Sequence, residues 1–312
     1  MTDRSDGARM SSLQSADGPA AVQALSVHDR GLHYGDGLFE TIVCLRGQPR
    51  FLRDHLQRLS ESCARLAIAA PAADELSARI LEAGRGGDCI VKLIVTRGEA
   101  KERGYRIDPA LCPTTLVLRH PLNRPDPAAI QSGVRARLGK LRLAESEQLA
   151  GMKHLNRLEQ VLARAEWSDP AIGESLLGSR SGELISGTMS NVFIVRQGAL
   201  ETPALERAGV RGVMRAVVLR TARAAGLAAH ERAIGWSELP GVREAFLTNS
   251  VMGVCPIREL DGRALEVGET TRRVQQLMGP LLAGDAGDAR LALPAGDPLL
   301  ASGARPPGAG GG

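Results

Sequence analysis

Short apolar runs of strand length alternate along this chain with longer segments of helical periodicity, and this alternation limits the possible folds more than any other feature. The runs of strand length lie at 38–45, 89–98, 114–120, 134–143 and 243–250. Helical patterns, with apolar residues three or four positions apart, lie at 51–68, 154–167 and 209–227. The segments 183–186 and 191–197 indicate a hairpin around Gly187. We find no repeat of fixed period, so the sequence predicts an α/β or α+β fold.

A proline-rich segment divides the chain into two parts. The sequence PLNRPDP at 121–127 contains three prolines, which interrupt both strands and helices. We therefore predict a smaller N-terminal α/β domain at 21–120, a linker at 121–127 and a larger C-terminal domain at 128–284, with a site between the domains. Residues 1–20 and 285–312 contain few large apolar side chains, so we predict that both ends are disordered tails.

Composition narrows the class of protein. The start of the chain lacks the basic and apolar regions of a signal peptide, and no apolar run approaches the roughly 20 residues that span a bilayer. Five cysteines are scattered without a C-x-x-C pair, which predicts reduced thiols in the cytoplasm and no zinc site. The net charge is only +4 and aromatic residues make up 3%, so we expect neither a nucleic-acid nor a membrane partner. A small anionic molecule is the favoured ligand.

Nucleotide and hydrolase motifs are absent from the chain, which leaves its lysines as candidates for chemistry. There is no G-x-x-x-x-G-K-[ST], G-x-G-x-x-G, G-x-S-x-G or H-E-x-x-H motif. Of the four lysines, Lys101 lies in a charged loop, and Lys92 and Lys140 lie in strand patterns where an outward side chain is ordinary. Lys153 follows a glycine where an irregular segment is predicted to become a helix. It is the best candidate for a desolvated amine that attacks a carbonyl cofactor.

Several segments could hold a phosphate group. The sequence GVRGVMR at 209–215 opens a predicted helix, whose free N–H groups and positive dipole end favour a dianion. Thr248, Asn249 and Ser250 end a predicted strand with two hydroxyls and an amide. Arg58 lies on the first predicted helix. Together these features point to a carbonyl cofactor that carries a phosphate.

The same segments resemble a known family, the fold-type IV pyridoxal-phosphate enzymes. The resemblance covers about residues 25 to 280 in order and spacing, and rests on DRGLHYGDGLFETI (29–42), HLQRL (55–59), KLIVTRGEAKERGY (92–105), AGMKHLNRLEQVLAR (150–164), SGTMSNVFIV (186–195), GVRGVMR (209–215) and TNSVMGVCPI (248–257). It implies two mixed domains with pyridoxal 5'-phosphate between them, bound by the C-terminal domain, and a homodimer.

The resemblance also implies roles for individual residues. Lys153 would form the covalent link to the cofactor, with Arg58, Ser250 and the backbone N–H groups of Val213 and Met214 at the phosphate. Thr248 and Asn249 would flank that phosphate. The KHLNRLEQV run after the lysine and the arginine-rich run at 97–105 look like the aminodeoxychorismate lyase members, which convert 4-amino-4-deoxychorismate to 4-aminobenzoate and pyruvate for folate biosynthesis. The alternatives are a D-amino-acid or branched-chain aminotransferase and a non-catalytic cofactor-binding homologue.

One position departs from the family pattern. A Glu usually stands five residues before the Asn of SNVF and pairs with the pyridine nitrogen, but here that residue is Ser186. Glu183 is an odd number of residues away, so on a strand it points to the opposite face. A hydroxyl cannot hold a pyridinium, and the cofactor should be a weaker electron sink. We therefore expect elimination, whose product becomes aromatic, to be favoured over transamination.

Candidates for the substrate's two carboxylates are arginines, because their planar forks bind carboxylates through two hydrogen bonds. We predict Arg97 and Arg103 in this role, with Tyr34 lining the pocket. The resemblance further implies that residues of a second subunit contribute to the site.

Overall fold

The computed structural model describes residues 25–124 and 126–284, and it has the mixed α/β fold that the sequence predicts. The tails predicted at 1–20 and 285–312 lie outside the described residues. Among the residues described, no helix has the length and apolar character needed to cross a membrane.

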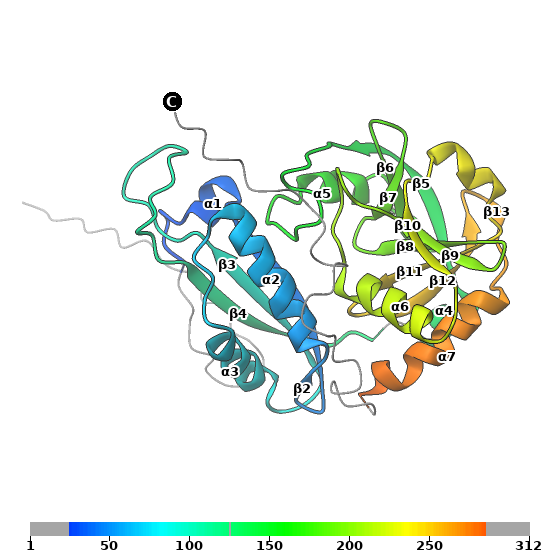
Figure 1. The fold of residues 1–312 in the computed structure, drawn as a ribbon, viewed down its shortest axis with the longest axis horizontal. Coiled ribbons are helices and arrows are strands. Elements are labelled where there is room, and N and C mark those ends of the chain that lie inside the picture. The colour runs from blue at the N-terminus through cyan, green and yellow to red at the C-terminus, as the bar shows by residue number, and fades with distance from the viewer. Residues whose placement is uncertain (1–24, 125, 285–312) are drawn as a thin grey trace, which may run out of the picture.

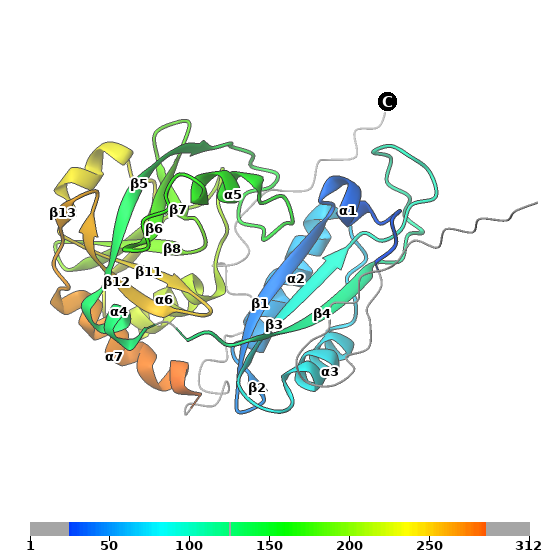
Figure 2. The same ribbon diagram turned by 180° about the vertical axis from the view of Figure 1, so that it is seen from behind.

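The N-terminal part is a four-stranded antiparallel sheet covered on one face by helices (Figure 1). The strand order is β2-β1-β3-β4, with β1 at Gly37–Leu45, β2 at Gln48–Pro49, β3 at Cys89–Thr96 and β4 at Thr114–Pro121. Helices α2 (Leu52–Leu66) and α3 (Ala73–Gly84) bury alternate residues of β1 and β3. Figure 2 shows the opposite face of this sheet, which carries no helix of the N-terminal part. Helix α1 (Arg30–Tyr34) precedes β1.

The C-terminal part is a nine-stranded mixed sheet. Its main path runs β10-β9-β8-β11-β12-β5-β6-β7, and β13 pairs with β12. The strand bounds are β5 Val134–Leu143, β6 Ile172–Ser179, β7 Leu184–Gly187, β8 Asn191–Arg196, β9 Ala199–Pro203, β10 Ala229–Arg232, β11 Glu244–Asn249, β12 Gly253–Leu260 and β13 Arg263–Ala264. β5 pairs in parallel with β6 and β12, and β9 pairs in parallel with β10.

Two long helices cover one face of this sheet. Helices α6 (Val213–Ala224) and α7 (Glu269–Ala283) pack on a core that includes Phe193 and Phe246, whose rings stack with centroids 4.8 Å apart. A second core on the other face combines strand residues with Ile234, Leu239 and other residues of the segments that connect the strands. The shorter helices are α4 (Pro127–Ser132), α5 (Leu158–Arg164) and a 3-10 helix at Trp236–Gly241. Between β4, which ends the first sheet along the chain, and β5, which begins the second, the chain passes through α4.

Two local predictions are wrong. The predicted hairpin does not form, because β7 pairs with β6, whereas β8 pairs with β9 and β11. A turn at 187–190 instead carries the chain from β7 to β8. The helix predicted at 154–167 is also shorter, and α5 begins only at Leu158. Residues 153–155 are extended because their backbone pairs with the start of β1.

Candidate active site

Lys153 lies on an extended segment at the edge of the N-terminal sheet, rather than at a helix junction. Its carbonyl accepts a hydrogen bond from the N–H of Phe39 at 3.0 Å, and the N–H of Leu155 donates to the carbonyl of Gly37 at 2.9 Å. The Lys153 Nζ lies 4.3 Å from the centroid of the Phe39 ring. Burial, followed by the charge of Arg58, lowers the pKa of Lys153 to about 8 against the opposing charge of Glu40. The amine is therefore much closer to its nucleophilic neutral form than an exposed lysine.

A buried ionic cluster of Glu40, His55 and Arg58 lies next to this lysine. The Arg58 Nε donates to Glu40 Oε1 at 2.8 Å, Nη2 donates to Oε2, and Nη1 donates to the carbonyl of Arg211 at 3.0 Å. The His55 Nδ1 lies 2.7 Å from Glu40 Oε2. Burial acts to raise the pKa of Glu40, but the charge of Arg58 and the hydrogen bonds from His55 and Arg58 lower it to about 2. Glu40 and His55 are site residues that the sequence analysis did not single out.

Arg58 thus connects the two halves of the molecule and still has hydrogen-bonding capacity. A guanidinium carries five N–H donors, and the three bonds above leave two of them for a ligand. Its partner Glu40 is 1% exposed, so the guanidinium is held in one orientation by a bidentate contact. A preoriented arginine of this kind suits a phosphate oxygen.

The start of α6 provides a second anion contact. No side chain caps this helix, and its N-cap is Gly212, so the N–H groups of Val213 and Met214 have no acceptor within the helix. A Cβ at position 212 would lie 2.0 Å from Asn191 Oδ1, which explains the glycine. The Asn191 Nδ2 donates to the carbonyl of Val210 at 2.8 Å and fixes the loop before the helix.

The end of β11 supplies the remaining polar groups. The Thr248 hydroxyl is fully buried and has no hydrogen-bond partner among the described residues. The Asn249 Oδ1 accepts from the N–H groups of Val251 and Met252 at 2.9 and 2.8 Å, which shapes the turn. The Ser250 Oγ lies 3.5 Å from His55 Nε2. The unpartnered hydroxyl of Thr248, the uncapped start of α6 and the oriented guanidinium of Arg58 are each suited to a phosphate oxygen.

Ser186, at the end of β7, is buried, and its hydroxyl donates to the carbonyl of Gly187 at 2.8 Å. Glu183 does not replace the missing carboxylate, because it pairs with Arg207 at the surface at 2.7 Å. The position that the family pattern gives to Glu is therefore occupied by a neutral side chain.

Of the substrate residues predicted from the sequence, Arg97 is held by contacts within the protein. Arg97 is buried, and its Nε and Nη2 donate to both oxygens of Asp36 at 2.7 and 3.0 Å. Its remaining contacts are the carbonyls of Leu66 and Ala67. The guanidinium N–H groups that could bind a carboxylate through two hydrogen bonds are therefore already bound to Asp36. The other bonds of Arg97 fix the end of α2.

The other two predicted substrate residues belong to the region around the 97–113 loop. The N–H of Gly104 donates to the Tyr34 hydroxyl at 3.2 Å, and the Tyr34 ring contacts the Tyr105 ring at 5.3 Å. Arg103 is exposed in the same loop, which projects from the N-terminal part at the upper left of Figure 1.

Lys92 lies closer to the site than the sequence analysis expected. Its Nζ is 5.4 Å from the centroid of the Phe39 ring, the same ring that Lys153 approaches. Its charge helps to lower the pKa of Lys153. The cross-strand partner of Lys92 is Thr41. A lysine opposite a polar residue within an apolar strand was the available sequence signal.

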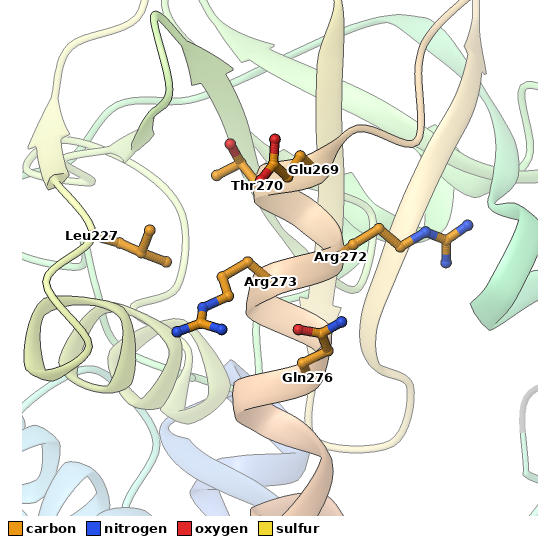
Figure 3. A pocket seen from close by; sticks show the side chains of 6 residues that line it. All are labelled: Leu227, Glu269, Thr270, Arg272, Arg273 and Gln276. Atoms are coloured by element: carbon orange, nitrogen blue, oxygen red, sulfur yellow. The ribbon is translucent and has the colours of Figure 1, made fainter.

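A separate pocket lies along α7 (Figure 3). It is lined by Leu227, Glu269, Thr270, Arg272, Arg273 and Gln276. None of the residues around Lys153 belongs to it, so it is distinct from the candidate active site.

Comparison with known proteins defines the class. The amino-transferase class IV family matches residues 37–260, and the chain belongs to this family of enzymes. Solved structures of the same fold include a form with pyridoxal phosphate bound.

Individual relatives narrow the comparison. The structure of 4-amino-4-deoxychorismate lyase from Pseudomonas aeruginosa is 45% identical and has a TM-score of 0.80, covering 85% of this chain and 97% of that one. Aminodeoxychorismate lyase of Vibrio harveyi is 30% identical over 79% of this chain and 93% of its own length. A provisionally named branched-chain-amino-acid aminotransferase of Methanocaldococcus jannaschii is 32% identical over 81% of this chain and 89% of its own length.

Proposed function

We propose that this protein is a pyridoxal-phosphate-dependent lyase that converts 4-amino-4-deoxychorismate to 4-aminobenzoate and pyruvate. The observation that carries the proposal is the buried amine of Lys153, whose pKa is lowered to about 8, close to the ion pair of Glu40 and Arg58. We propose that Arg58, Ser250 and the start of α6 form the phosphate seat. The similarity to the Pseudomonas aeruginosa lyase supports the choice of reaction.

In this proposal the protein binds the cofactor at both ends. When bound, pyridoxal phosphate supplies an electrophilic carbonyl and an electron-withdrawing pyridine ring. Arg58, Ser250 and the N–H groups of Val213 and Met214 would hold its phosphate, and Ser186 would lie at its ring nitrogen. The cluster of Glu40 and His55 keeps Arg58 in place.

Lys153 is the base. Its neutral Nζ takes the proton from C4 of the substrate, which carries the amino group. The bond from C3 to the enolpyruvyl oxygen breaks, the ring becomes aromatic, and the released group takes up a proton to become pyruvate. The atoms of the substrate equal those of the two products, so no oxidant or further reactant is required. Because aromatisation drives the step, the neutral Ser186 is sufficient at the ring nitrogen.

The substrate's carboxylates need cations that Arg97 cannot supply. We propose Lys92 for one of them, since its amine lies on the Phe39 ring beside Lys153. Arg103 and Tyr34, in and beside the 97–113 loop, are proposed for the other carboxylate in a neighbouring subunit.

A homodimer is part of this proposal. Helix α5, just after the Lys153 segment, exposes Leu158, Val161 and Leu162 at 76%, 60% and 62%, and residues at this spacing form one face. Met189 and Tyr105 are also exposed. A second copy of the chain would cover these apolar groups. The described cysteines are all free, which agrees with a cytoplasmic location.

The second candidate function is transamination, which the Methanocaldococcus jannaschii relative favours. Incubation with enzymatically prepared aminodeoxychorismate, followed by assay of 4-aminobenzoate and pyruvate, separates the two. The lyase proposal predicts both products in equal amounts. Conversion of the bound cofactor to its amine form by amino acids alone, without 4-aminobenzoate formation, would instead establish an aminotransferase.

A further inference from the structure

Glu174 on β6 is a buried carboxylate that the proposed reaction does not use. It is 1% exposed, and no cationic side chain pairs with it in the part of the chain that the structure describes. Its two oxygens accept hydrogen bonds from backbone N–H groups and hydroxyls. Oε1 accepts from the N–H of Ser175 at 2.9 Å, the N–H of Thr188 at 3.0 Å and the Thr188 hydroxyl. Oε2 accepts from the Ser190 hydroxyl at 2.8 Å and the N–H of Met189 at 3.4 Å.

Four of these five donors belong to one short segment, the turn of residues 187–190. The N–H of Gly187 also donates to the carbonyl of Ser190 at 2.8 Å, which closes the turn. A Cβ at position 187 would lie 2.8 Å from the Glu174 carboxylate and 2.2 Å from the Ser190 hydroxyl. The turn is therefore folded directly around the Glu174 side chain, with no space for a residue larger than glycine at its first position.

The turn connects the two ends of the proposed cofactor site. Ser186 precedes it and Asn191 follows it. The Asn191 side chain binds the carbonyl of Val210 in the loop before α6. Within the turn, the carbonyl of Met189 accepts from the Asn249 side chain at 3.2 Å, next to Ser250. Both the ring-nitrogen contact and the phosphate seat are thus linked to the one segment that Glu174 holds.

We infer that Glu174 is a positioning residue that sets the spacing between the pyridine contact at Ser186 and the phosphate seat. This inference rests on the proposed cofactor, but not on the proposed reaction. Glu174 touches neither Arg58 nor the start of α6, and its turn reaches the phosphate seat only through Asn191 and Asn249. Loss of Glu174 should therefore change the spacing between the two ends more than the phosphate seat itself. Pyridoxal phosphate spans both ends, whereas inorganic phosphate occupies only one.

The difference between these two ligands provides the test. In Glu174→Gln, an amide NH2 replaces one carboxylate oxygen and meets the donors of Met189 and Ser190, so the turn must move. We expect the apoprotein of this variant to bind pyridoxal phosphate about 10- to 100-fold more weakly than the wild type, by equilibrium dialysis. Its affinity for inorganic phosphate, by isothermal titration calorimetry, should stay within about threefold of the wild type.

Glu183→Gln is the matched control. It makes the same chemical change a few residues away, at a surface pair with Arg207, and should alter neither affinity by more than about twofold. Ser190→Ala removes a single donor and serves if Glu174→Gln does not fold. It should weaken pyridoxal phosphate binding about 3- to 10-fold, again without weakening phosphate binding.

Three results would overturn the inference. An equal loss of affinity for both ligands would show a general loss of structure, and an unchanged pyridoxal phosphate affinity with only a lower melting temperature would show a purely structural carboxylate. A wild type that takes up no pyridoxal phosphate would remove this inference together with the cofactor proposal. A wild type that binds the cofactor but forms no 4-aminobenzoate would contradict only the proposed reaction, and the comparison of variants would still measure the role of Glu174.

Discussion

Replacing Glu40 by Gln should make the folded protein less stable at neutral pH and change how its stability depends on pH. The pKa of Glu40 falls from an ordinary 4.5 to about 2, and each unit corresponds to about 1.4 kcal/mol. The charged Glu40 therefore contributes about 3 kcal/mol to the free energy of unfolding. Because the folded-state pKa is the lower one, this contribution is complete above pH 4.5 and is lost as the pH falls through about 2. At pH 3 only about 1 kcal/mol should remain.

The measurement is chemical denaturation of the apoprotein and its variant between pH 3 and 7. At pH 7 the wild type should exceed Glu40→Gln by about 3 kcal/mol, because the variant also leaves the buried Arg58 without its counter-charge. The difference should shrink by about 2 kcal/mol at pH 3, because Glu40 is then protonated in the unfolded chain and must lose that proton on folding. Glu75→Gln, at an exposed pair with Arg79, should show a difference below about 0.5 kcal/mol at every pH. A difference between wild type and Glu40→Gln that does not change with pH would refute the reasoning.

Three further changes test the site itself. Arg58→Ala should weaken pyridoxal phosphate binding by about one to three orders of magnitude, and an unchanged affinity by titration would exclude Arg58 from the phosphate seat. Borohydride reduction of the protein loaded with pyridoxal phosphate should label Lys153, and a label on Lys92 would contradict the assignment of Lys153. The rate of cofactor uptake by the apoprotein should rise with pH around a midpoint near 8. Ser186→Glu should gain half-transamination with amino acids, read from cofactor absorbance, because a carboxylate stabilises a pyridinium; ready transamination by the unchanged protein would contradict the role given to Ser186.

The strands of the N-terminal sheet could be predicted from the sequence because their character is local. β1, β3 and β4 each form where a run of apolar residues suggested a strand, and α2 forms where an apolar stripe suggested a helix. Pairing is not local. The hairpin predicted around Gly187 failed because β7 and β8 find better partners in β6 and β11, strands that the local pattern does not connect to them.

The residues of the candidate site likewise differ in whether local sequence identifies them or only non-local contacts do. Lys153, Ser250 and the start of α6 were selected by residue type and by their resemblance to the family motifs, although the helix junction expected at Lys153 is absent. The role of Arg97 could not, because its partner Asp36 lies 61 residues earlier in the chain. The place of Lys92 in an otherwise apolar strand is a sequence signal, but the strand does not show that Phe39 and Lys153 lie close to it. Glu174 escaped notice because its turn reaches it from 14 to 16 residues away.

The backbone pairing of Lys153 with β1 makes the position of its amine depend on both halves of the polypeptide. The segment that carries this lysine follows α4 along the chain, yet its hydrogen bonds run to Gly37 and Phe39. On the other side, Arg65 of α2 donates to the carbonyls of Gln148 and Ala150, just before the lysine. A chain cut between β4 and α4 would therefore yield two fragments, neither of which can present the amine correctly alone. When the fragments are mixed, borohydride labelling of Lys153 should return only to the extent that they reassemble. The extent of labelling would therefore measure the association of the two halves.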